Sequence, residues 1–224
     1  MTAFSDPSVA DGLQRRRDNF LLLRIIAALL VIYGHSFVLS PQHGLKGIFA
    51  SSGWHTYSGD IAVDIFFVVS GFMVSGSYIR RSDLFQFMQA RILRIVPGLL
   101  LCLLVCACVL GPLLTTLSLH EYLHAPAVFD YVSQNLKFSS HMAWHLPGVF
   151  LHSAYSPSVN GSLWTLPAEF RMYVFVAILG ALGLLRWRPL LSSVLAVLVL
   201  MGLFAPGYLP VHPMWIRLAG YFVL

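Results

Sequence analysis

Long apolar runs constrain this chain more than any other feature. A helix that crosses the hydrocarbon core of a bilayer needs about 20 mostly apolar residues in succession. Four stretches meet that length: 20–39, 61–79, 95–114 and 162–185. A fifth run is slightly short, at 189–204, and a sixth begins near Trp215. We therefore expect an all-α, polytopic bundle of transmembrane helices with about five to six spans.

The composition agrees with a membrane protein. Only 10% of the residues are charged and 58% are hydrophobic, whereas soluble domains carry about 25% charged residues. We therefore attribute the net charge of +5 to the orientation of the spans in the membrane. The bilayer is an expected partner, and nucleic acid is not. We expect a short amino-terminal tail, residues 1–19, followed by one helical membrane domain over residues 20–224.

The arginines predict the orientation of the spans. Loops on the cytoplasmic side of a membrane carry an excess of Lys and Arg. On one side of the predicted spans the chain places Arg15, Arg16, Arg17, Arg80, Arg81, Arg91, Arg94, Arg186 and Arg188. The opposite loops hold only Lys46 and Lys137. We therefore predict that the amino terminus is cytoplasmic.

Two ionisable residues lie inside the first predicted span, in "RIIAALLVIYGH". Arg24 and His35 are eleven residues apart, which places them on one helix face about 16 Å apart. Ionisable residues at membrane depth usually face a bundle interior or a cavity. Arg24 could instead reach the headgroups, and His35 could be an interfacial side chain. Their shared face favours a lined cavity.

Two carboxylates also fall within predicted spans. Asp64 enters the second span, and Glu169 follows Pro167, where we expect a kink in the fourth. Glu169 and Arg171 are two residues apart, so they point to different faces, and Glu169 should look into the bundle for a partner. Ser70 lies in a run of small residues that permits close helix approach.

Arg91 and Arg94 are three residues apart on one helix face at the predicted cytoplasmic boundary. Guanidinium groups bind phosphate oxygens in a bidentate manner, so the pair is a candidate phosphate site. An ordinary positively charged inner loop is the alternative. Trp164 could stack on a sugar, although aromatic residues also gather at membrane interfaces.

Four blocks taken together resemble the acyltransferase-3 family, whose membrane enzymes acylate, and usually O-acetylate, bacterial surface glycans and related acceptors. The blocks are "RIIAALLVIYGH", "VDIFFVVSGFMVSG", "RILRIVPG" and "NGSLWTLPAEFRMYV". They cover residues 24 to 174. Members of this family usually have about ten spans, so the resemblance implies a chain shortened at its carboxyl end.

The resemblance implies a protein of the bacterial inner membrane that moves an acyl group, usually acetyl, from cytoplasmic acyl-CoA. The acceptor would be a hydroxyl of an extracytoplasmic glycan or a lipid-linked saccharide. Acyl-CoA would be a substrate, and no bound cofactor or metal is expected.

The same resemblance suggests roles for individual side chains. His35 would act as general base or as covalent acyl carrier, with Glu169 or Asp64 orienting it. The residues expected to bind donor or substrate are Arg24, Arg91, Arg94, Ser70 and Trp164.

Two other functions compete with acyl transfer. A proton-coupled transporter could use Asp64, His35 and Glu169 as a relay. The segment "HEYLH", residues 120–124, matches the His-Glu-x-x-His pattern of zinc proteases. Pro126 follows that segment closely, which is unfavourable for the long helix of such a site.

Overall fold

The computed structural model describes residues 19–39, 47–52, 57–139, 141–153, 158–204, 207 and 213–223. The predicted amino-terminal tail lies outside the described residues except for Asn19, and so do the three arginines at 15–17.

Within these residues all regular secondary structure is helical. The first half contains α2 (Phe20–Leu39), α3 (Ile48–Ser51), α4 (Ser58–Arg81), α5 (Leu84–Val105), the π-helix η1 (Cys106–Leu110) and α6 (Gly111–Leu114). The second half contains α7 (Leu119–His124), α8 (Pro126–Leu136), the 3-10 helix η2 (Gly161–Trp164), α9 (Thr165–Ala181), the 3-10 helix η3 (Leu184–Arg186), α10 (Arg188–Phe204) and α11 (Pro213–Val223).

Four helical segments are long and apolar enough to cross a membrane: Phe20–Leu39, Ser58–Arg80, Leu84–Leu114 and Gly161–Ala181. The apolar helix Pro189–Met201 is shorter. These segments confirm the predicted all-α membrane bundle.

The third span begins earlier than the prediction of residue 95. The carboxylate of Asp83 accepts a hydrogen bond from the Gln86 N–H and caps the first turn of α5. From there one face of the helix is buried along Phe87, Ile95 and Leu99. Arg91 and Arg94 therefore lie on a continuous helix, as predicted, and the alternative of an inner loop at these residues does not hold.

The fourth span begins with a 3-10 turn. The side chain of Asn160 accepts a hydrogen bond from the Ser162 N–H, and η2 then leads directly into α9. Pro167 falls in the first turn of α9, where a missing N–H is tolerated. We predicted a kink at Pro167. The structure instead changes from a 3-10 helix to an α-helix between Trp164 and Thr165, just before the proline.

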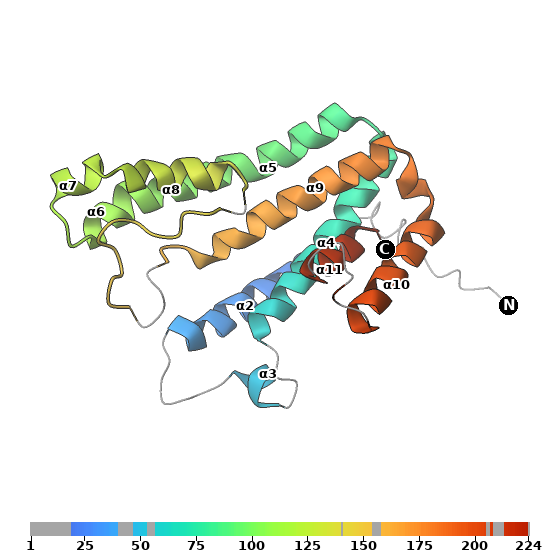
Figure 1. Cartoon of the computed structure of the whole chain (residues 1–224), viewed down its shortest axis with the longest axis horizontal. Helices are drawn as coiled ribbons and strands as arrows, with labels where there is room; N and C mark the ends of the chain where they lie inside the picture. The colour runs from blue at the N-terminus through green and yellow to red at the C-terminus, as the bar shows by residue number, and fades with distance from the viewer. Residues whose placement is uncertain are drawn as a thin grey trace.

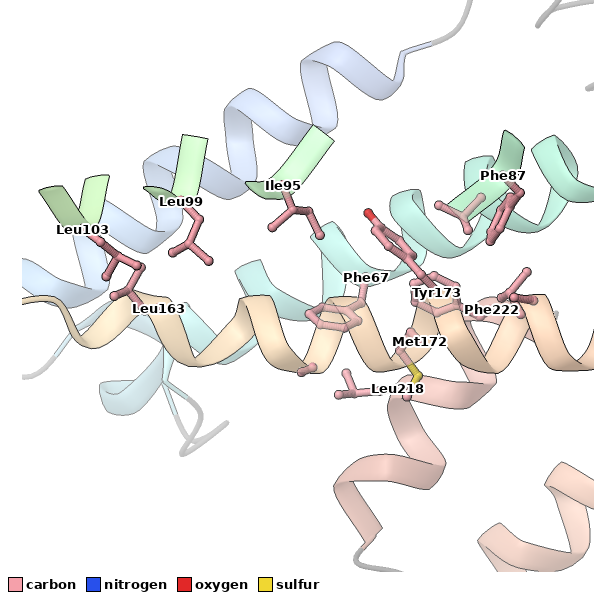
Figure 2. Packing of buried hydrophobic residues seen from close by; sticks show 14 of the residues in the cluster. Phe67, Phe87, Ile95, Leu99, Leu103, Leu163, Met172, Tyr173, Leu218 and Phe222 are labelled. Carbon is pink, nitrogen blue, oxygen red and sulfur yellow. The ribbon is translucent and has the colours of Figure 1, made fainter. Parts of the chain in front are cut away.

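Helices α4 and α9 form the centre of the bundle. Helix α4 packs against α2, α11 and α9, and α5 packs on the other side of α9 (Figure 1). Figure 2 shows Ile95, Leu99 and Leu103 pointing from α5 toward α9. These residues belong to a buried cluster that also includes Tyr173 and Phe222. The core therefore joins helices that are far apart in the sequence.

Gly71 allows α11 to approach α4 closely. A Cβ atom at this position would lie 1.9 Å from the backbone oxygen of Tyr221. In addition, the Ser75 hydroxyl donates a hydrogen bond of 2.5 Å to the Phe222 carbonyl. The interpretation of this run as a close helix approach is thus confirmed at Gly71.

Candidate active site

A cavity of about 290 Å³ lies where four helices meet. Its walls come from α2, α4, α5 and α9. The lining residues are Arg24, Val63, Phe66, Phe67, Ser70, Arg94, Thr165 and Glu169. The structure therefore brings four of the predicted site residues to one place.

Helical spacing explains why α4 and α9 present these side chains together. Val63, Phe67 and Ser70 recur at intervals of three to four residues on α4, so they share one face. On α9, Thr165 and Glu169 are also four residues apart. The site therefore has an apolar wall with a few polar groups set into it.

The carboxylate of Glu169 is held by two hydroxyl groups. The Ser70 hydroxyl donates a hydrogen bond of 3.2 Å to Oε1, and the Tyr173 hydroxyl donates to the same oxygen. Both donors are buried, with 6% of Ser70 and 0% of Tyr173 exposed. Both hydrogen bonds therefore converge on one carboxylate oxygen, Oε1.

Arg24 and Arg94 bring two positive charges to this cavity from different helices. The Nη2 atom of Arg24 lies 3.8 Å from the sulfur of Met73. Within the described ranges, neither guanidinium forms an ion pair with Glu169. The cavity therefore offers two cations and one carboxylate that are not neutralised by direct contact.

Arg91 does not line the cavity of Arg94, although the two residues are only one turn apart on α5. Its guanidinium carbon lies 5.6 Å from the ring centroid of Phe87 and 5.7 Å from that of Tyr173. It lines a different cavity, which also includes Arg80. The predicted pair of guanidiniums thus does not face a single cavity.

His35 lies near the far end of α2 and does not line the cavity of Arg24 and Glu169. Its Nδ1 atom is 2.8 Å from the Val31 carbonyl oxygen and 3.2 Å from the Tyr57 hydroxyl. A carbonyl oxygen only accepts hydrogen bonds, so Nδ1 carries the proton. In the neutral ring Nε2 is therefore the basic nitrogen.

Asp64 has a partner that the sequence analysis did not name. Its Oδ1 atom lies 3.4 Å from Nε of Arg217 on α11. Asp64 thus pairs with Arg217, and Glu169 accepts hydrogen bonds from Ser70 and Tyr173. Neither carboxylate orients the imidazole of His35 in this structure. Arg171 points to another face than Glu169, as predicted, and its guanidinium carbon lies 5.0 Å from the Trp215 ring centroid.

Trp164, the last predicted binding residue, ends η2 and is 36% exposed. It does not line the cavity, although Thr165 next to it does.

The His-Glu-x-x-His segment forms the six-residue helix α7. Glu121 belongs to a capping box with Ser118, whose hydroxyl and backbone N–H both donate to the carboxylate and lower the pKa of Glu121. The rings of His120 and His124 stack with centroids 4.2 Å apart. No cluster of three or more metal-binding side chains occurs in the described part of the chain. The local geometry is thus that of a helix start.

Sequence reasoning missed Tyr173 and Arg217. The four-residue spacing from Glu169 to Tyr173 was a usable signal, because side chains at i and i+4 meet on a helix. No such signal existed for Arg217, since its contact with Asp64 depends on how α11 packs against α4.

Comparison with known proteins assigns the family. A family model described as an acyltransferase domain matches residues 18–224. The chain is 31% identical over 163 residues to an O-acetyl transferase of Shigella phage Sf6, a match covering 69% of this chain and 43% of the relative. It is 32% identical over 190 residues to Nodulation protein 10 of Rhizobium leguminosarum bv. viciae, covering 82% of this chain and 49% of that protein.

The chain thus spans about half the length of the curated relatives that it matches. No solved structure matches it. The family match extends from the start of α2 through α11, and it includes every residue of the cavity. The chain therefore belongs to the acyltransferase-3 family.

Proposed function

We propose that this chain is an acyltransferase that moves an acyl group, acetyl in the first instance, from acyl-CoA to a hydroxyl of a surface glycan or lipid-linked saccharide. One observation carries the proposal: Arg24, Ser70, Arg94 and Glu169 converge from four helices on one cavity inside a membrane bundle. A relative named as an O-acetyl transferase supports the choice of reaction.

The reaction needs an anion site and a base. The acceptor oxygen attacks the thioester carbonyl carbon, the carbon–sulfur bond breaks, and CoA leaves as a thiolate. Arg24 and Arg94 would bind phosphate groups of the donor, because charge-assisted hydrogen bonds to phosphate are strong and directional. The apolar wall, with Phe66 and Phe67, would keep water from the thioester.

His35 would remove the proton of the acceptor hydroxyl through Nε2. Imidazole suits this role because its unperturbed pKa of about 6.5 lies near neutral pH. His35 and Arg24 stand about 16 Å apart along α2, a separation that the extended pantetheine arm of the donor would bridge. Transient transfer of the acyl group to Nε2 is the alternative role for the same nitrogen.

The two carboxylates would then serve different purposes. Glu169, held by Ser70 and Tyr173, would balance the charges of Arg24 and Arg94 before the donor binds. Asp64 would act as a positioning residue, because its ion pair with Arg217 joins α4 to α11. Arg91 and Trp164 would contribute to donor binding only at the margins of the site.

The same proposal places the protein in the cytoplasmic membrane of a bacterium, with the amino terminus inside. The uneven distribution of arginines between the loops supports this orientation. Donor would then enter near Arg24 and Arg94, and acceptor would approach near His35.

Transfer of labelled acetyl from acetyl-CoA to surface glycan tests the function. Bacterial membranes would contain the parent chain, His35→Ala or no added protein, at matched protein levels. The proposal expects label with the parent and background label with His35→Ala. Background label from the parent would contradict acetyl transfer by this chain, and equal label from parent and variant would remove His35 from the mechanism.

A further inference from the structure

An apolar groove of about 440 Å³ runs along the outside of α4. Its walls come from α4, from Leu185 of η3 and from the end of α11. Val68, Phe72 and Ile79 line it from α4, and each of them is exposed. Figure 1 shows α11 lying against α4. The groove extends from Val68 to Arg80, which is about 18 Å at 1.5 Å per residue.

Arg80 also borders a polar cavity of about 270 Å³ at the turn between α4 and α5. Arg91 and Gln86 line this second cavity from α5. The groove and the polar cavity therefore share Arg80 as a lining residue.

The two arginines of the polar cavity have no anionic partner among the described residues. The Nε atom of Arg91 is buried without a hydrogen-bond acceptor. Asp83 lines the same cavity, but its carboxylate accepts the hydrogen bond from the Gln86 N–H that caps α5. An anion in this cavity would therefore meet two guanidiniums that are not ion-paired and one carboxylate, so that positive charge remains in excess.

The depth of these features in a bilayer follows from the length of α4. Its 24 residues span about 36 Å, which exceeds the ~30 Å hydrocarbon core. Arg80 is next to the last residue of α4, so it reaches headgroup level. The apolar part of the groove, from Val68 to Ile79, runs back into the hydrocarbon region.

We propose that the groove and the polar cavity together bind one anionic phospholipid of the surrounding bilayer. An acyl chain lies along α4 against Phe72 and Ile79, and the lipid phosphate sits between Arg80 and Arg91. The charge of the site and its depth select this occupant, because basic pockets at the headgroup level of membrane bundles suit anionic lipid headgroups. The site shares no lining residue with the cavity of Glu169, and Arg91 is the one residue that the proposed function also uses, at the margin of donor binding.

Native mass spectrometry of the purified chain in neutral detergent tests the proposal. Phosphatidylglycerol and phosphatidylcholine with the same acyl chains are titrated in parallel. The parent chain should prefer phosphatidylglycerol. Arg80→Gln should weaken binding of phosphatidylglycerol about five-fold, the contribution of one cation near an anionic lipid surface. Lys137→Gln removes an exposed cation at the end of α8 and should leave binding unchanged.

Gly76→Leu tests the apolar part of the site separately. A Cβ atom at Gly76 would meet only Nη1 of Arg80, at 3.5 Å, so α4 should tolerate the substitution. The leucine side chain would enter the groove, because Gly76 is one of its lining residues. Both lipids should then bind more weakly, whereas Arg80→Gln should affect mainly the anionic one. If Gly76→Leu fails to fold, the comparison of Arg80→Gln with Lys137→Gln still tests whether the site binds the anionic lipid.

Three results would overturn the proposal. The first is an equal effect of Arg80→Gln and Lys137→Gln on phosphatidylglycerol binding, and the second is no preference of the parent chain between the two lipids. The third is displacement of phosphatidylglycerol by palmitoyl-CoA at concentrations well below those of the lipid, which would assign the groove to a long-chain acyl donor.

Discussion

The hydroxyl of Tyr173 donates a hydrogen bond to the carboxylate of Glu169, one helical turn earlier on α9. Arg91 lies over the face of the Tyr173 ring, with its guanidinium carbon 5.7 Å from the ring centroid. Tyr173 is completely buried. It therefore contacts an arginine of one cavity while it binds the carboxylate of the other.

Tyr173→Phe should lower the rate of acyl transfer about tenfold while leaving the fold intact. The substitution keeps the ring beneath Arg91 and removes only the hydrogen bond to Glu169, and a hydrogen bond to a charged group contributes about 1.5–3 kcal/mol. The initial rate of labelled acetyl transfer measures the effect. Tyr131→Phe, at a fully buried tyrosine of α8, is the matched control and should keep the parent rate. Equal rates for both variants would show that Tyr173 does not position Glu169.

Gly71→Ala should destabilise the packing of α11 on α4. Its Cβ would lie 1.9 Å from a backbone oxygen, which cannot move aside as a side chain would. Overpacking of this kind costs about 1–3 kcal/mol, so the melting temperature should fall by several degrees. Gly76→Ala is the control on the same helix, because its Cβ has space. It should be neutral or stabilising by up to about 1 kcal/mol. Melting temperatures of the two variants in the opposite order would contradict this packing.

The ion pair between Asp64 and Arg217 predicts a coupling between two single substitutions. Asp64→Asn leaves Arg217 without its partner at membrane depth, and Arg217→Gln does the same for Asp64. Each should lower the stability, whereas the double variant should lose less than the sum of the two. A double-mutant cycle on unfolding in detergent should give a coupling of about 1 kcal/mol, within the usual range for contacting residues. Additive losses would mean that the contact of 3.4 Å does not hold α4 to α11.

The capping box of α7 predicts a pH effect that can be observed at a single side chain. The Ser118 hydroxyl and backbone N–H stabilise the charged form of Glu121 and lower the pKa of its carboxyl below the ordinary value of 4.5. Because the folded-state pKa is depressed, this support for α7 is present above pH 4.5 and is lost as the pH falls through the folded-state value. Ser118→Ala should raise the pKa of Glu121 toward 4.5, as an NMR titration of its side chain would show. An unchanged titration midpoint would exclude the capping box.

The sequence predicted the spans and half of the cavity-lining residues because helical periodicity and hydrophobic length are local properties. The alignment of Arg24 within the first span and the inward position of Glu169 follow from spacing alone, and both residues line the cavity. Arg91 and Arg94 line different cavities, because positions three residues apart on a helix differ by about 60° in direction. The guanidinium of Arg91 lies over the ring of Tyr173, 5.7 Å from its centroid.

Other features depend on contacts between helices, which spacing cannot reveal. Asp64 meets Arg217 only because α11 returns to α4 at Gly71. The start of α5 at Leu84 depends on a cap at Asp83 that precedes the apolar run. We predicted from their shared face on α2 that Arg24 and His35 line one cavity. Only Arg24 lines the cavity of Glu169, because about 16 Å along α2 separates the two residues.

Binding of acetyl-CoA to the purified chain tests the central claim most directly, because it requires neither an acceptor nor turnover. Isothermal titration calorimetry would compare the parent with Arg24→Gln, Arg94→Gln and the surface control Lys137→Gln. The cavity assigned to the donor predicts that each of the first two variants binds acetyl-CoA at least about tenfold more weakly, as expected when a charge-assisted hydrogen bond to phosphate is lost. The control should bind like the parent. Equal affinity in all four proteins, or no binding by the parent, would contradict the assignment of this cavity to the acyl donor.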